Sequence, residues 1–241
     1  MAESYQIYLN SKYATSYFNN TYKFSLNTLE IDEGHYIYLS IVHVSIPYSF
    51  YNVHENNNRL EYISNNLGYV VNIPVSNYNI NQLISYLSSA MPSFTITYSN
   101  KTNKITFKHS TYDFTILSSS TCYRILGFDE NKSYTSYGTI LVSSNCINLM
   151  TINSIFLLSN LLTYNISSSI PNSQNILCQI PVDNGPNSLI HYYNKNDFRT
   201  NLFLKYINDI SLRLVDEYNN DINLNGLHFR VTIQLDKEHF K

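Results

Sequence analysis

The chain is poor in glycine, proline, cysteine and charge. Its 241 residues include six Gly, six Pro, three Cys and no Trp. The two closest glycines are Gly127 and Gly138, so neither the G-x-G-x-x-G dinucleotide motif nor a P-loop is present. The hydrophobic content is 44%, and with so little Gly and Pro this excludes collagen-like and disordered classes. The sequence therefore predicts a globular chain without the common nucleotide-binding motifs.

Charge is also scarce, at 13% of residues with a net charge of −2. This balance does not favour nucleic acid or an anionic lipid surface as a partner. The nearest approach to a basic patch is Lys101, Lys104, Lys108 and His109, which we interpret as the solvated edges of one hairpin. No apolar run is long enough to span a membrane, and the N-terminus has no export signal. We expect a soluble protein made in a reducing cytoplasm.

Titratable residues do not cluster at catalytic or metal-binding spacings. The seven histidines form no HxH or HExxH motif, and no CxxC pair or GxSxG elbow occurs. Cys122, Cys146 and Cys178 are interpreted as three buried small side chains, and Asp216 with Glu217 as part of a turn. The sequence therefore predicts no enzyme, no catalytic, cofactor-binding or metal-binding residue, and no cofactor.

Alternating patterns dominate and predict strands. Residues 94–98 and 104–108 predict a hairpin with one wet face, and residues 112–117 are expected to continue it as a meander. Residues 21–26, 209–214 and 228–235 alternate in the same way. In residues 35–46 the aliphatic residues occupy odd positions as far as Ile41 and even positions from Val42 onward. This change in the phase of the alternation predicts a β-bulge or a strand buried on both faces.

One helix is predicted over residues 80–91. Ile80, Leu83, Ile84 and Leu87 follow its apolar period and are expected to pack on the hairpin. Asn79 and Gln82 form a capping box, Pro92 ends the helix, and a short helical turn at residues 121–126 closes at Gly127. We therefore predict an all-β fold, a single jelly-roll β-sandwich with a helix-and-hairpin insertion. Residues 1–18 are expected to form an N-terminal arm. Residues 19–241 form the jelly-roll domain, with an inserted subdomain around residues 60–127.

The longest uncharged stretch is residues 133–182, which contain no Asp, Glu, Lys, Arg or His. At the chain's 13% charge content, about six charges would be expected there. Such a stretch is either a buried central strand region or part of a subunit contact, since interface cores are depleted in charge. Ile147, Leu149, Ile152 and Tyr164 are the candidate contact residues.

Asn and Tyr are abundant, with 34 and 23 copies. Tyr and Asn side chains suit sugar-binding grooves and adaptable protein interfaces. An A/T-rich coding sequence produces the same bias without selection for binding. Both explanations stay open at this point.

Five segments, in this order, carry a family resemblance. Residues 45–62 contain Ile-Pro-Tyr-Ser-Phe-Tyr-Asn, and residues 71–84 lead a strand into the predicted helix, with Ser76 or Asn77 where a glycine is common. Residues 95–107, 124–128 and 210–233 follow. Together they resemble the penton (minor capsid) proteins of virophages, Polinton-like viruses and related large DNA viruses.

The resemblance implies a structural viral capsid protein. Such a protein forms a homopentamer that closes the five-fold vertices of an icosahedral capsid, beside a major capsid protein with a double jelly roll. It would be located in the virion after synthesis in the host cytoplasm. We expect no nucleic acid as its partner and no membrane span. The alternative is a β-sandwich attachment module that binds a glycan or a receptor.

Overall fold

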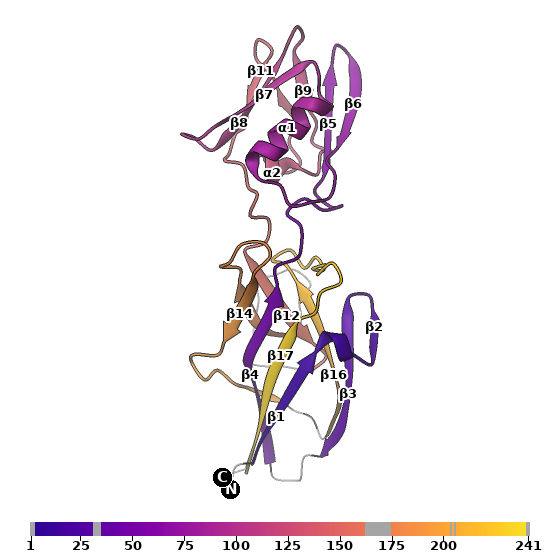
Figure 1. The fold of residues 1–241 in the computed structure, drawn as a ribbon, viewed down its shortest axis with the longest axis vertical. Coiled ribbons are helices and arrows are strands. Elements are labelled where there is room, and N and C mark those ends of the chain that lie inside the picture. Colours follow the sequence, from indigo (N-terminus) through magenta and orange to yellow (C-terminus); the bar gives the residue numbers. More distant parts are fainter. Residues whose placement is uncertain (1–2, 31–34, 162–174, 203, 205, 240–241) are drawn as a thin grey trace. The chain divides into compact units, whose positions relative to one another are not determined.

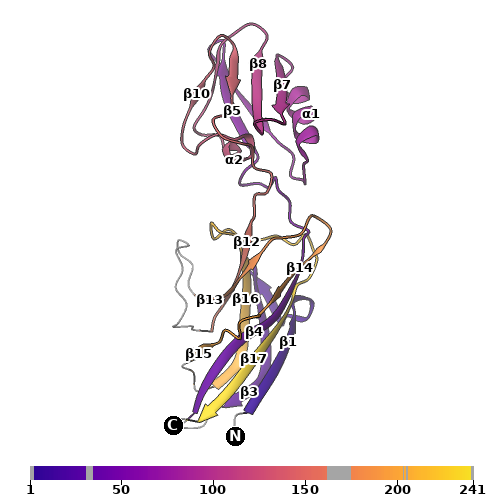
Figure 2. The ribbon, with the colours of Figure 1, turned by 90° about the vertical axis from the view of Figure 1, so that its left-hand side faces the viewer.

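The computed structural model describes residues 3–30, 35–161, 175–202, 204 and 206–239, and its ribbon is drawn in Figures 1 and 2. The chain divides into two compact units. The sandwich comprises Met1–Phe50 and Ile152–Lys241, and the inserted unit comprises Tyr51–Thr151. Within the described residues, no helix is long and apolar enough to cross a membrane.

The sandwich is a jelly roll, as predicted. One sheet has the order β1-β17-β4-β14, with β15 also paired to β4. Its strands are β1 (Glu3–Asn10), β17 (Arg230–His239), β4 (His35–Pro47), β14 (Leu189–Tyr193) and β15 (Thr200–Leu202). The other has the order β13-β12-β16-β3-β2. Its strands are β13 (Ile176–Pro181), β12 (Ser154–Ser159), β16 (Tyr206–Val215), β3 (Thr21–Glu30) and β2 (Ser16–Phe18). All strand pairs of the two sheets are antiparallel, and the chain passes several times from one sheet to the other, which is the jelly-roll arrangement (Figure 2).

A β-bulge in β4 explains the phase flip read from the sequence. Thr232 of β17 pairs with His43 and the next residue, Ile233, pairs with Ile41, so Val42 is the extra residue. Because of this insertion, Ile41 and Val44 are both buried in the same core. Of the two explanations that the pattern allowed, the bulge is the one observed.

The N-terminal residues differ from the predicted arm. Glu3–Asn10 form β1, which pairs along its whole length with β17. A 3-10 turn, η1 (Ser11–Tyr13), then carries the chain to β2 in the other sheet (Figure 1). Leu9 is 6% exposed and belongs to the sandwich core, which explains why this segment joins the fold.

The inserted unit interrupts the jelly roll between β4 and β12. One of its sheets has the order β10-β9-β5-β6, and the other the order β11-β8-β7. Its elements are β5 (Arg59–Ser64), β6 (Leu67–Asn72), α1 (Ile80–Ala90), β7 (Phe94–Ser99), β8 (Lys104–His109), β9 (Phe114–Ile116), α2 (Tyr123–Leu126), β10 (Tyr134–Thr135) and β11 (Ile140–Val142). The unit has a core of its own, and its bounds are wider on both sides than the predicted range of 60–127.

The helix α1 forms as predicted, with the full capping box between Asn79 and Gln82. Leu83 and Leu87 are fully buried, Ile84 is half-buried against the same core, and Ile80 is only partly buried. The helix packs beside β7, in agreement with the expected contact to the hairpin.

The predicted meander is wrong in its third strand. The hairpin of β7 and β8 forms, but β9 pairs with β5 and β10, and the strand beside β8 is β11. The cause is local. The ring of His109, at the end of β8, accepts hydrogen bonds at Nδ1 from the backbone N–H groups of Thr111 and Tyr112, at 3.0 and 2.9 Å. This cap lies in the turn where the chain leaves β8, before β9 begins.

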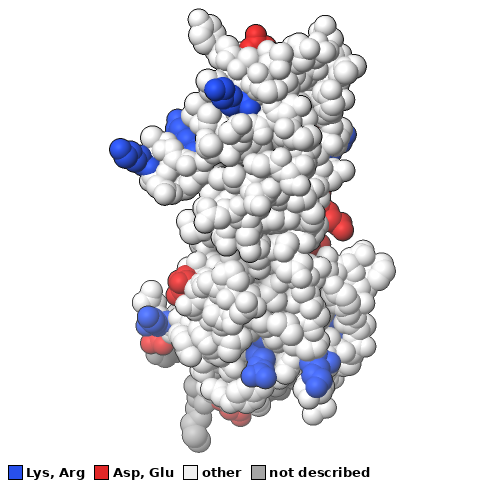
Figure 3. Space-filling model, turned by 45° about the horizontal axis from the view of Figure 1, so that its top comes forward, with Lys and Arg blue, Asp and Glu red and all other residues white. Residues whose placement is uncertain are grey.

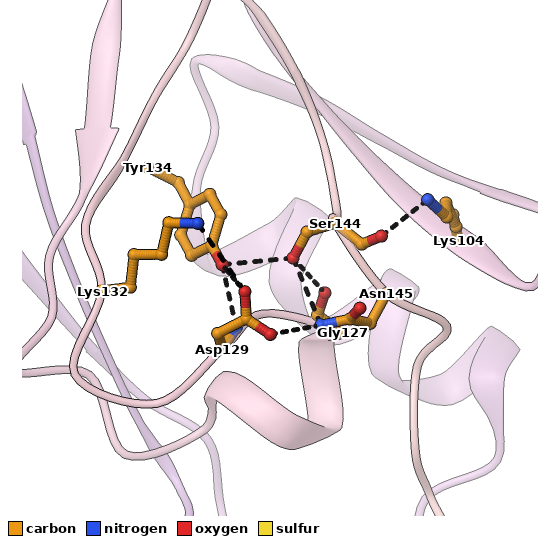
Figure 4. A network of polar contacts seen from close by, with 7 residues as sticks. All are labelled: Lys104, Gly127, Asp129, Lys132, Tyr134, Ser144 and Asn145. Atoms are coloured by element: carbon orange, nitrogen blue, oxygen red, sulfur yellow. Dashed lines mark hydrogen bonds and ion pairs between the residues drawn. The ribbon is translucent and has the colours of Figure 1, made fainter.

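The turn after α2 is fixed by close packing and a polar network (Figure 4). Gly127 has φ +77°, and a Cβ there would lie 2.4 Å from the carbonyl oxygen of Asn145, so only glycine fits. The Asp129 carboxylate accepts from the Tyr134 hydroxyl at 2.5 Å and from Asn145 Nδ2 at 2.7 Å. These bonds, led by the one from Tyr134, lower the pKa of Asp129.

The abundant asparagines have a structural use. Among the described residues, ten of the twelve non-glycine positions with positive φ are Asn. Asn19–Asn20 and Asn65–Asn66 are two-residue turns between adjacent strands. Asn tolerates left-handed backbone better than other side chains, because its short amide bonds locally. In a chain with six glycines, Asn therefore supplies many of its turns.

Candidate assembly surface

One edge of the sandwich combines open strands with exposed aromatic rings. We call it the N-terminal edge and define it as β1, η1 and β2. Among the described residues, β1 pairs only with β17 and β2 only with β3, so both sheets end here with a free strand side. Such edges are ready to pair with another chain unless they are protected.

Five large aromatic side chains project from this edge. Their exposed fractions are 38% for Tyr5, 74% for Tyr8, 71% for Tyr13, 57% for Tyr17 and 76% for Phe18. Between Glu3 and Lys23 the only charged residue is Lys12. Aromatic enrichment and charge depletion are the compositional signs of an interface core. Charged side chains are sparse over the visible face of the molecule as well (Figure 3).

The turn η1 of the N-terminal edge is fixed by hydrogen bonds. Ser11 is buried, its backbone N–H donates to the carbonyl of Phe229 at 3.0 Å, and its hydroxyl accepts from the Phe229 N–H at 3.1 Å. The Asn10 side chain caps η1 by accepting from Lys12 N at 3.0 Å. Rigid aromatic residues lose little conformational entropy on binding, so this edge is suited to a permanent contact.

Tyr22 anchors the β2 end of this edge. The ring centroid of Tyr17 lies 4.6 Å from that of Tyr22, which in turn packs edge-on against Phe229 at 5.1 Å. Burial, assisted by the neighbouring Tyr17, raises the pKa of Tyr22. The exposed ring of Tyr17 is thus supported by the core beneath it.

The opposite edge of the sandwich ends in β14 and β13, which each pair with a single strand of their sheet among the described residues. We call the exposed apolar residues there the β14 edge. They are Leu189, Tyr193 and Phe198, with exposed fractions of 50%, 57% and 47%. The sandwich therefore has two different apolar edges, one on each side.

The uncharged stretch of residues 133–182 is buried in part, whereas Tyr137 and Met150 within it are 94% and 71% exposed. Ile152 is 8% exposed and belongs to the sandwich core, so the prediction that it contacts another subunit is wrong. Ile147 and Leu149 are half-buried against the core of the inserted unit, and Tyr164 lies outside the described residues.

Burial of the strand β12 accounts for the missing charge in one part of this stretch, residues 154–159. It lies between β13 and β16, and both of its faces are buried. Ile155 and Leu157 join the main core, whereas Phe156 and Leu158 form a second cluster with Ile176 and Val215. The sequence analysis did not single out the N-terminal edge; the signal that could have indicated it is its five aromatic residues, with Lys12 as the one charged residue between Glu3 and Lys23.

The three cysteines, which could have served as nucleophiles, differ in their burial. Cys122 is fully buried, which raises the pKa of its thiol to about 12, so it is not a thiolate nucleophile. Cys178 is buried with a raised pKa as well, but Cys146 is exposed, so the prediction of three buried cysteines is wrong for Cys146. The described residues contain no group of three or more His, Cys, Asp or Glu that could hold a metal ion.

Asp216 closes the loop that follows β16. Its carboxylate accepts from the backbone N–H groups of Tyr218 and Asn220, both at 2.8 Å, and from the Asn220 side chain at 3.0 Å. Glu217 binds the side chain of Asn153 at 3.1 Å instead of facing Asp216. The pair therefore has no geometry for joint acid–base chemistry.

Comparison with known proteins identifies the fold. No family model matches the chain, and no curated protein matches it. The crystal structure of the selenomethionine-labelled mavirus penton protein is similar, with a TM-score of 0.52 at 9% sequence identity. The match covers 99% of this chain and 100% of that chain. VP17, a capsid protein of bacteriophage P23-77, aligns over 98% of this chain with 10% identity, but its TM-score of 0.16 supports no conclusion.

Proposed function

We propose that this chain is a penton, a structural protein of an icosahedral viral capsid, and that five copies form a ring at each five-fold vertex. The observation that carries the proposal is the fold match to the mavirus penton protein over the whole length of both chains. The family resemblance of the sequence supports it independently. The chain would then reside in the virion after synthesis in the host cytoplasm, beside a double-jelly-roll major capsid protein. A structural role of this kind needs no catalytic residue or cofactor.

The two edges of the sandwich suit a cyclic assembly. A ring uses two different patches on each subunit, which meet head to tail. We propose that the N-terminal edge of one subunit contacts the β14 edge of the next. Both edges expose aromatic or aliphatic side chains, and at each edge the last strand of both sheets pairs with one neighbour among the described residues. Permanent contacts of this type bury apolar surface and are poor in charge.

Electron cryomicroscopy of particles containing this chain tests the proposal directly. We expect density for five copies at each five-fold vertex, with the sandwiches adjacent around the ring. Density for the chain at any other position in the particle would contradict the vertex assignment. Native mass spectrometry of the purified chain adds a second measurement, because a ring of five has a mass distinct from that of a dimer or trimer.

A further inference from the structure

The hairpin of β7 and β8 holds the unpaired positive charge of the inserted unit. All residues of this unit are described, and it contains six Lys and Arg. Three of them have acidic partners: Arg59 with Glu61, Arg124 with Glu130 at 3.5 Å, and Lys132 with Asp129 at 3.9 Å. The other three are Lys101, Lys104 and Lys108, and none of them forms an ion pair within the described residues. All three lie on the one hairpin.

The strand geometry places two of these lysines on one surface. Ile105 and Phe107 of β8 are fully buried in the core of the inserted unit. Because side chains alternate along a strand, Lys104, Thr106 and Lys108 face outward. The two lysines are four residues apart, which corresponds to about 13 Å along the strand. Lys101 is exposed in the turn at the Lys104 end.

Hydroxyl groups line this row of charges. In the register of the hairpin, Ser99 pairs with Lys104, Thr97 with Thr106, and Thr95 with Lys108. On the other side, β11 places Val142 beside Thr106 and Ile140 beside Lys108. We call this surface the lysine face and define it as the outward residues of β7, β8 and β11 with Lys101.

No carboxylate forms an ion pair with the lysines of the lysine face, within the part of the chain that the structure describes. Residues 62–112 contain neither Asp nor Glu. The first acidic residue after them, Asp113, uses its carboxylate to accept from Thr139 N at 2.8 Å and from the Ser136 hydroxyl at 3.2 Å. Lys104 Nζ donates to the carbonyl of Ser144 at 2.7 Å, a neutral partner that leaves the lysine charge uncompensated. The surface is therefore complementary to a negatively charged partner.

We propose that the lysine face binds a sulfated polysaccharide. The lysines supply spaced point charges for sulfate groups, and the rows of Ser and Thr supply neutral donors and acceptors for sugar hydroxyls. Nucleic acid is less well matched, because no arginine or exposed aromatic ring lies among the outward residues to stack on bases. A lipid surface is the other outcome that the test includes: the turn at residues 100–103 is Asn-Lys-Thr-Asn and offers no apolar side chain, but Ile140 and Val142 on this face are 41% and 49% exposed.

The test uses the purified full-length chain and immobilised heparin as the probe. We expect saturable binding that weakens as NaCl is raised. The double variant Lys101→Gln/Lys108→Gln, which keeps the bond of Lys104 to Ser144, should lose about tenfold in affinity, as expected for two lost charge contacts. A control with the same change in net charge, Lys132→Gln/Lys195→Gln, should stay within about twofold. Should the double variant melt at a lower temperature, Lys101→Gln alone, in an exposed turn, replaces it.

The proposal is overturned by no binding to heparin, by an equal loss of affinity in the test and control variants, or by binding to neutral dextran of the same strength. Tighter binding of duplex DNA or of phosphatidylserine vesicles through the same lysines would also overturn it and assign the face to that partner. The inference does not rest on the proposed ring. Failure to bind heparin leaves the vertex assignment intact, and density away from the vertices leaves the heparin result intact.

Discussion

His43 Nε2 lies 3.2 Å from His191 Nδ1, in the neighbouring strands β4 and β14 of the sandwich. Their ring centroids are 5.5 Å apart, and the ring of Tyr193 packs against both. A hydrogen bond between two imidazoles needs one nitrogen without a proton, so at least one of the rings is neutral. Burial, and secondarily the charge of His191, lowers the pKa of His43 below its ordinary value of 6.5.

The first prediction is a loss of sandwich stability in acid. A lowered pKa in the fold means that the unfolded chain binds the proton more tightly, so stability decreases as the pH falls below about 6.5. We expect the melting temperature of His43→Gln to differ less between pH 7.5 and pH 5.5 than that of the unmodified chain. His191→Gln removes only the smaller of the two causes and should give an intermediate difference. Equal pH dependence in all three chains would contradict this account.

The second prediction concerns the turn between β5 and β6. Asn65 and Asn66 have φ values of 49° and 59°, in the left-handed region. Asn66→Ala should reduce the free energy of unfolding by about 1 kcal/mol, because a Cβ without a locally bonding amide disfavours this conformation. Asn66→Gly, the matched variant, should leave stability unchanged or raise it, since Gly suits the second position of this turn. Urea denaturation measures both, and equal losses in the two variants would show that backbone strain is not the cause.

The third prediction tests the packing of α1. Leu83 is fully buried, so Leu83→Asp places an unpaired charge in the core of the inserted unit. We expect a loss of more than about 3 kcal/mol in stability. Ser85→Asp adds the same charge at an exposed position of the same helix and should change stability by less than about 0.5 kcal/mol. Unchanged thermal melting of Leu83→Asp would contradict the observed burial.

Local patterns in the sequence were sufficient to predict α1 and the hairpin, and they left the bulge as one of two explanations of the phase flip. In each case the signal lies within a few residues: the Asn79 cap, the alternation along β7 and β8, and the phase flip at Val42. The partners of β9, which the expected meander assigned wrongly, could not be predicted in the same way. The turn before β9 is capped by the His109 ring, which is a contact of one side chain and leaves no periodic pattern in the sequence.

The candidate assembly surface was harder to predict, because depletion of charge has two physical causes. Ile152 lacks charged neighbours in the sequence since it is in the core, whereas Tyr8 lacks them while 74% exposed. Composition alone does not separate a strand buried on both faces from an apolar surface. Only the sheet order, which puts β12 in the middle and β1 at an edge, makes the distinction.

The fourth prediction is that assembly resists salt. The N-terminal edge carries two charged residues, Glu3 at its start and Lys12, and exposes five large aromatic side chains. Attraction at such an edge comes from apolar burial and hydrogen bonds, which salt does not screen. The mass of the assembled species should therefore be the same at low ionic strength and at 1 M NaCl, where the screening length falls to about 3 Å. Dissociation on addition of salt would indicate a charge-driven contact elsewhere on the chain.

The fifth prediction locates the contact. Tyr8 and Phe18 are 74% and 76% exposed, so the double variant Tyr8→Ser/Phe18→Ser should fold and melt as the unmodified chain does. Each truncation removes a large aromatic surface that the ring would bury, and the anchors of an interface cost about 2 kcal/mol or more when truncated. We therefore expect the double variant to remain monomeric, or to be absent from particles, under conditions where the unmodified chain assembles. Tyr137→Ser is the control, because Tyr137 is 94% exposed but belongs to the inserted unit. If Tyr137→Ser prevents assembly and the double variant does not, the subunit contact lies in the inserted unit and not at the N-terminal edge.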